Sequence, residues 1–158
     1  MTFRYSTLGG EVGPASDAAE LIGIAGRLPA WDEITIEHEG ARFPHASLTW
    51  HESHGLVLQW FEDEESWGFF LAEGAVVAPP EVDIVLGGQV QERWPRQLFV
   101  ARALAAEAVD HFLKTGTQKE TMHWICTDGF LPETVWKGRA GREAWKRSRD
   151  KSNGSRRT

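Results

Sequence analysis

The chain has 158 residues, of which 41% are hydrophobic and eight are tryptophan, so it can bury a core and is too apolar for a disordered protein. No run approaches the roughly 18 consecutive apolar residues of a membrane helix, and no secretion-signal pattern is visible, so we expect a cytoplasmic protein. One cysteine, Cys126, excludes an internal disulfide and a multi-cysteine metal site.

The net charge of −6 is unevenly distributed along the chain. Residues 136–158 hold nine Lys or Arg and two acidic residues, a net charge of +7, whereas residues 1–135 hold eight basic and 21 acidic residues, a net charge of −13. We therefore expect one acidic domain at 1–135 and a basic, partly disordered tail at 136–158 with at most two helical turns. An acidic body repels nucleic acid and attracts basic proteins.

The first predicted element is a helix that begins after Asp17, a favoured N-cap residue, and ends before Pro29. Alternating apolar and polar residues then predict strands at 33–39 and 45–51. The run at 56–61 is apolar almost throughout, which is typical of a central strand covered on both faces.

An acidic connection at 62–66 joins this strand to a fourth one at 67–72, as in a hairpin. The segment 78–88 contains two prolines, which limit it to an edge position. The longest helical pattern covers 96–116, and a last strand covers 121–126. This order predicts an α+β fold: an antiparallel meander of about five or six strands with two helices packed on one face.

Histidines offer one candidate metal site. His45, His51 and His54 lie near Glu52, and histidines beside a carboxylate can bind zinc. Their spacing matches neither HExxH nor another fixed ligand pattern, so we prefer to interpret them as polar residues of an exposed strand face. A small metal-dependent enzyme that uses these three histidines is kept as an alternative.

Other catalytic patterns are weak. Cys126 and His123 would point to opposite faces of a strand, and the "LGG" segment at 86–88 lacks the further residues of a phosphate-binding loop. We therefore expect no catalytic residues, no metal and no cofactor.

The acidic tip, residues 62–65, is the strongest candidate for a binding site. Two tryptophans flank it, and two further acids lie on the polar face of the first predicted strand. Aromatic residues beside carboxylates are typical of surfaces that bind Arg and Lys, although a solvated turn would have the same composition. The predicted partner-binding residues are Glu62, Asp63, Glu64, Glu65, Trp60, Trp67, Glu37 and Glu39.

The basic tail suggests a second function. Its nine cations are interleaved with Trp136 and Trp145, a pattern that can bind a nucleic-acid backbone. The acidic domain would oppose such binding, so a nucleic-acid-binding adaptor is the alternative hypothesis rather than the preferred one.

Several segments resemble the first-numbered immunity family of bacterial polymorphic-toxin systems. The segment "RFPHASLTW" is similar to that family's FP-containing strand, "LVLQWF" to its apolar central strand and "LGGQV" to the glycine pair before its long helix. The segment "AVDHFLKTGTQKETMHW" resembles its closing helix and strand, although the chain lacks the proline that family members often carry after the Thr-Gly pair. The resemblance covers about Asp17 to Cys126.

Members of this family bind and inhibit a partner toxin, and some neutralise deaminases. The resemblance therefore implies stoichiometric inhibition of a basic toxin domain, without catalysis and without a small-molecule substrate or membrane partner. It implies no contact residues, and those named above rest on charge alone.

Overall fold

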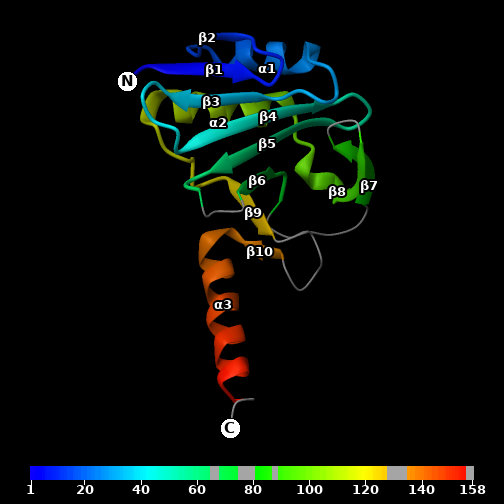
Figure 1. Ribbon diagram of the computed structural model, residues 1–158, viewed down its shortest axis with the longest axis vertical. Coiled ribbons are helices and arrows are strands. Elements are labelled where there is room, and N and C mark those ends of the chain that lie inside the picture. The colour runs from blue at the N-terminus through cyan, green and yellow to red at the C-terminus, as the bar shows by residue number, and fades with distance from the viewer. Residues whose placement is uncertain (65–67, 75–80, 87–88, 128–134, 156–158) are drawn as a thin grey trace.

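A computed structural model describes residues 1–64, 68–74, 81–86, 89–127 and 135–155 of the chain (Figure 1). These residues form an α+β fold with an eight-stranded antiparallel sheet, a separate two-stranded hairpin and three α-helices. The strand order in the main sheet is β10-β9-β6-β5-β4-β3-β1-β2. The predicted fold class, an antiparallel α+β meander, is therefore confirmed.

The centre of the main sheet consists of three strands, β3, β4 and β5, that are connected by hairpins. Their apolar residues follow the pattern that is visible in the sequence. Alternation places Ile34 and Ile36 of β3 in the core while their neighbours face outward. The strands of the main sheet are β1 (Phe3–Thr7), β2 (Val12–Pro14), β3 (Ile34–His38), β4 (His45–His51), β5 (Gly55–Phe61), β6 (Phe69–Ala72), β9 (His123–Thr127) and β10 (Val135–Lys137).

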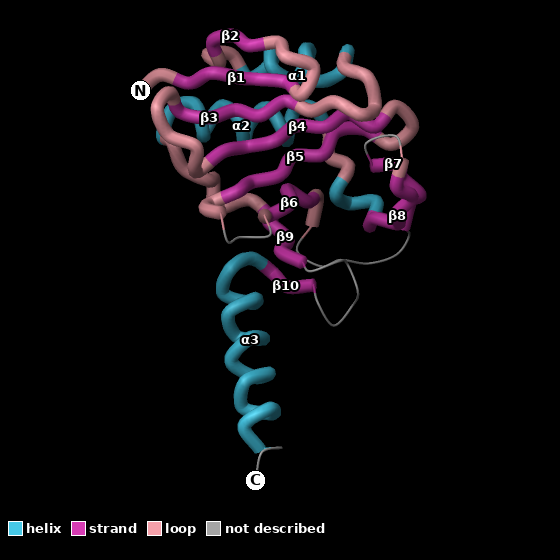
Figure 2. Tube along the Cα trace, viewed as in Figure 1, coloured by secondary structure: helices cyan, strands magenta, loops and turns pink. Residues whose placement is uncertain are grey.

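Two helices pack on the same face of the sheet, as predicted (Figure 2). α1 (Ala18–Arg27) begins at Asp17, whose side chain accepts a hydrogen bond of 2.8 Å from the backbone N–H of Ala19. α2 (Arg102–Thr115) ends at Gly116, where φ is +71°, a left-handed conformation that glycine adopts without strain.

The opposite face of the sheet is covered in part by the hairpin of β7 (Glu81–Leu86) and β8 (Val90–Pro95) and by the short 3₁₀ helix η1 (Arg96–Leu98). Val57 of β5 packs there against Phe99, while its neighbour Leu58 packs toward the helices. β5 is thus buried on both faces, which explains why its sequence is apolar almost throughout.

The sheet has more strands than the five or six predicted. β1 and β2 were not predicted: β1 has only five residues, of which Phe3 and Tyr5 are buried, and β2 has three residues in a stretch that is rich in glycine. The edge-like stretch before residue 88 forms β7, which pairs only with β8 and not with the main sheet. The boundary predicted after Val135 falls inside β10, which pairs with β9.

The basic tail also differs from its prediction. Instead of one or two turns, α3 (Gly138–Ser155) is a helix of 18 residues. Its N-terminal part lies against β9 and β10, and Trp145 packs against the main core. Nearby, Lys146 and Glu143 form an ion pair of 3.7 Å at i,i+3 spacing, which supports the helix.

No helix in the described parts of the chain is long and apolar enough to cross a membrane.

Candidate functional site

The acidic tip connects β5 to β6, as predicted. Asp63 and Glu64 are exposed and Glu62 is half-buried, whereas Glu65 and Trp67 lie outside the described residues. Glu64 forms an ion pair of 3.3 Å with Arg42, but both side chains are more than 70% exposed, so water screens the pair. The described part of the tip therefore presents carboxylates to solvent.

Trp60 does not have the place that the sequence suggested. We predicted Trp60 as a partner-binding residue, but the residue is only 3% exposed, and its ring packs edge-on against Phe112 of α2 with 4.8 Å between centroids. The reason is strand alternation: Trp60 shares the helix-covered face of the sheet with Leu58. Its indole Nε1 still donates a 3.5 Å hydrogen bond to Oε2 of Glu62, so the buried ring contacts the first residue of the tip.

The secondary acids lie at the same end of the sheet as the tip. In the strand register, Glu37 of β3 faces His45 of β4, which faces Phe61, the last residue before the tip. The side chain of Glu37 accepts two hydrogen bonds from Arg4, of 2.9 and 2.7 Å, and is 15% exposed. Its charge is thus largely compensated, whereas Glu39 is exposed.

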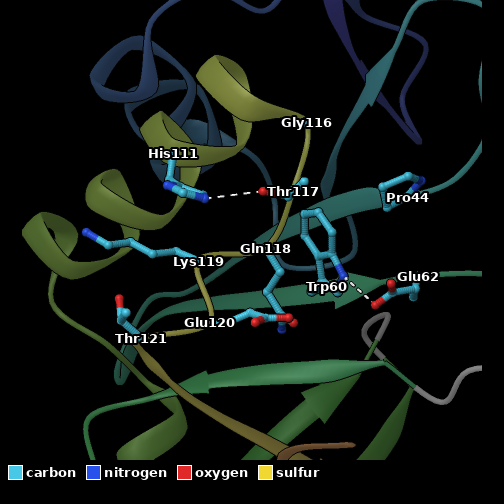
Figure 3. A pocket seen from close by; sticks show the side chains of 10 residues that line it. All are labelled: Pro44, Trp60, Glu62, His111, Gly116, Thr117, Gln118, Lys119, Glu120 and Thr121. Atoms are coloured by element: carbon cyan, nitrogen blue, oxygen red, sulfur yellow. Dashed lines mark hydrogen bonds between the residues drawn. The ribbon is translucent and has the colours of Figure 1, made fainter.

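A cavity of about 590 Å³ opens beside the acidic tip, between the end of β5 and the segment that follows α2 (Figure 3). Trp60 forms part of its wall and Glu62 lines it from the tip. The lining residues are Pro44, Trp60, Glu62, His111 and residues 116–121.

The cavity carries acidic groups and an unsatisfied donor. Glu62 and Glu120 supply carboxylates, while the one lining lysine, Lys119, is ion-paired with Glu107. The side-chain nitrogen Nε2 of Gln118 is buried and has no hydrogen-bond partner among the described residues. A buried donor without a partner destabilises the folded protein. A ligand that offers a hydrogen-bond acceptor to this nitrogen would therefore bind more tightly than one that does not.

Sequence reasoning did not find this cavity. Gln118 and Glu120 belong to the polar segment "TGTQKET", which has the composition of an ordinary loop after a helix cap. Only the pairing of β5 with β6, and of β6 with β9, brings that loop to the end of β5. Of the predicted acids that the structure describes, Glu62 alone lines the cavity.

The histidines do not gather into one site. His45 and His51 stand at opposite ends of β4, about 20 Å apart for six steps along a strand, too far to share a metal ion. His45 stacks between Phe43 and Phe61, with centroids 5.0 and 4.8 Å from its own. Within the described residues, no group of three or more His, Cys, Asp or Glu is arranged to hold a metal.

At the other end of β4, His51 and His54 both contact the ring of Phe99. His54 makes a 2.9 Å hydrogen bond through Nε2 with the carbonyl of Asp83, which ties it to the β7–β8 hairpin. Nε2 of His51 is buried without a partner among the described residues. Burial, and to a smaller extent the nearby His54, lowers the pKa of His51.

Cys126 is 1% exposed and sits in the main core, while His123 on the same strand is exposed. The cysteine is therefore a buried thiol with no access to a substrate. The glycine pair of the predicted "LGG" segment, residues 87–88, lies outside the described residues.

No protein-family model and no curated protein matches this chain.

Proposed function

We propose that the chain is an immunity protein that binds and inhibits a cognate bacterial polymorphic toxin, one that acts on nucleic acid, in the cytoplasm. It would act by stoichiometric binding and would catalyse no reaction. The sequence resemblance described above supports this proposal, and so does the net charge of −13 over residues 1–135. Toxins that modify nucleic acid need cationic clefts, which an anionic protein surface can occupy in place of phosphates.

The single observation that carries the proposal is the position of Glu62. This residue belongs both to the acidic tip and to the lining of the 590 Å³ cavity. Exposed carboxylates at the tip would attract a basic domain from a distance, because long-range electrostatics chiefly accelerates association. The cavity beside them would then receive an Arg or Lys side chain of the toxin.

The polar groups of the cavity fit such a side chain. A cation would meet the carboxylates of Glu62 and Glu120, and a main-chain carbonyl next to it would accept from Nε2 of Gln118. Charge-assisted hydrogen bonds of this kind are about twice as strong as neutral ones. A basic peptide segment therefore matches the cavity better than a free anion or an apolar ligand.

The test is co-expression with the toxin domain that is encoded beside the gene for this chain. Expression of the toxin domain alone should arrest growth, and co-expression of the chain should restore it and give an equimolar complex on gel filtration. Replacement of residues 62–65 by Asn or Gln should weaken protection. Glu52→Gln is a matched control, because this exposed acid lies at the opposite end of β4.

Two results would contradict the proposal. One is that the toxin domain arrests growth equally with and without the chain. The other is protection without any complex, which would indicate that the chain destroys a toxic product rather than blocking the toxin.

A further inference from the structure

The C-terminal helix α3 has a charge opposite to that of the rest of the chain. Over Gly138–Ser155 it contains six basic and two acidic residues, a net charge of +4. Among its described side chains, Lys146, Arg147 and Lys151 are exposed. This helix is not part of the acidic site and takes no role in the function proposed above.

α3 also extends away from the body of the protein. Figures 1 and 2 show that only its first turns lie near the sheet and that the rest projects downward into open space. Trp145 marks the attachment, since its side chain packs against the core. At 1.5 Å per residue the helix is about 27 Å long, so about 15 Å of it lies beyond Trp145.

This geometry weakens the objection that the acidic domain would repel a polyanion. Electrostatic interactions between exposed charges are screened over about 8 Å at physiological ionic strength. The end of α3, from about residue 151 onward, therefore lies more than one screening length beyond Trp145. Lys151 can act there with little influence from the net charge of −13 carried by residues 1–135, whereas Lys146 and Arg147 lie closer to the acidic body.

The spacing of the cations follows the helix axis. Among the described side chains, Arg147 and Lys151 are four residues apart and so lie on one face of the helix, next to Lys146. A duplex presents one negative charge about every 1.7 Å of its axis when both strands are counted, so the roughly 15 Å of helix beyond Trp145 can lie beside a stretch that carries about nine phosphates. A linear row of cations matches this linear polyanion better than it matches the compact acidic tip of another protein.

We propose that α3 is an arm that binds the phosphate backbone of nucleic acid without sequence preference. The contacts would be of Lys and Arg with phosphate oxygens, and the acidic domain would remain outside the complex. This proposal does not rest on the function proposed for the acidic site, and either can hold without the other.

The experiment measures binding of the full chain to a fluorescein-labelled 20-base-pair DNA duplex by fluorescence anisotropy, at several salt concentrations between 50 and 200 mM. We expect the logarithm of the binding constant to fall linearly with the logarithm of the salt concentration. In the triple variant Lys146→Gln, Arg147→Gln and Lys151→Gln, the slope should become shallower by about 0.9 for each phosphate that is no longer neutralised, and affinity at 50 mM salt should fall at least tenfold.

Two controls distinguish the loss of positive charge from a loss of folded structure, and a third tests sequence preference. Far-UV circular dichroism should show that the triple variant keeps its helix content, because Gln is a good helix former. Glu52→Gln, which changes one charge on the acidic body, should leave the salt slope unchanged. A second duplex of unrelated sequence should bind with an affinity within about twofold, as backbone contacts require.

The proposal is overturned if the wild-type chain does not bind duplex at 50 mM salt, or if the folded triple variant binds with an unchanged slope. It is also overturned if sedimentation shows that α3 joins two copies of the chain and that the triple variant is monomeric while neither binds DNA. In that case the arm recognises the acidic surface of a second copy.

Discussion

The indole Nε1 of Trp60 donates a hydrogen bond of 3.5 Å to Oε2 of Glu62, which links a core residue to the first carboxylate of the acidic tip. Trp60 is buried, and Glu62, only two residues later, reaches the charged surface. Glu62 lies at the wall of the cavity, and the ring that it contacts packs against Phe112 of α2. The tip is therefore supported by the core from which it projects.

The burial of Trp60 predicts a large stability effect. Trp60→Ala should lower the free energy of unfolding by about 3–5 kcal/mol, since it removes a packed aromatic side chain and leaves a cavity. Trp31→Ala is the matched control, because Trp31 is 51% exposed and should cost well under half as much. Urea denaturation measures both. Unchanged stability of Trp60→Ala, together with an inability to bind the toxin, would show that Trp60 is a surface anchor after all.

Replacement of the tip acids, residues 62–65, by Asn or Gln should slow association with the toxin domain more than it speeds dissociation. The rate constant for association should fall by roughly tenfold at low salt, and the difference from wild type should shrink as salt screens the charges. Stopped-flow fluorescence at two ionic strengths measures this. If association is equally fast in both proteins at low salt, the tip does not attract the partner.

Much of the fold could be predicted because its elements carry local signals. The alternation along β3 and β4, the cap at Asp17 and the glycine after α2 each depend on a few neighbouring residues. β1 was missed, because its residues Phe3–Thr7 form a short strand whose place depends on pairing with the distant β3 as well as with β2. The length of α3 was underestimated, since its contact through Trp145 is tertiary.

The candidate site was only partly predictable for the same reason. The acids of the tip adjoin one another in sequence, so their charge was visible. The alternation of β5 places Trp60 on the same face as Leu58, so the burial of Trp60 follows from a local pattern. Gln118 and Glu120 come to the tip through the topology of the sheet, which no local pattern encodes.

A polar cluster at the N-terminal hairpin predicts a loss of stability in acid. The carboxylate of Glu11 accepts hydrogen bonds of 2.8 and 3.3 Å from Arg27 and one of 2.9 Å from the Tyr5 hydroxyl. Arg27, and then Tyr5, lowers the pKa of Glu11 in the folded state. The unfolded state, with a pKa of about 4.3, therefore takes up the proton first as pH falls, and stability declines below that value until the folded-state pKa is passed.

A double-mutant cycle isolates this contribution. Glu11→Gln and Arg27→Gln should each flatten the decline of the urea midpoint between pH 5 and 3, and the double variant should add little to either single change. Simple addition of the two effects would show that the two side chains do not act as a pair.

The environment of His51 predicts a second pH dependence of stability, at higher pH than that of Glu11. Burial in contact with Trp94 and Phe99 disfavours the imidazolium form, so the pKa of His51 lies below its ordinary value of about 6.5. The unfolded state then binds a proton more readily than the folded one. The sign is therefore that stability falls as pH drops below about 6.5, until the folded-state pKa is passed.

His51→Phe should remove this pH dependence, since the replacement keeps an aromatic ring against Phe99 and has no proton to gain. It also removes the buried Nε2 that lacks a partner among the described residues. The stability of the variant relative to wild type should therefore increase as pH falls from 7.5 to 5.5. His54→Gln should change the profile less, because burial outweighs His54 as the cause of the lowered pKa. The urea midpoints of wild type and of the two variants, determined at four pH values, measure these differences in stability. Identical pH profiles for wild type and His51→Phe would show that another group titrates in this range.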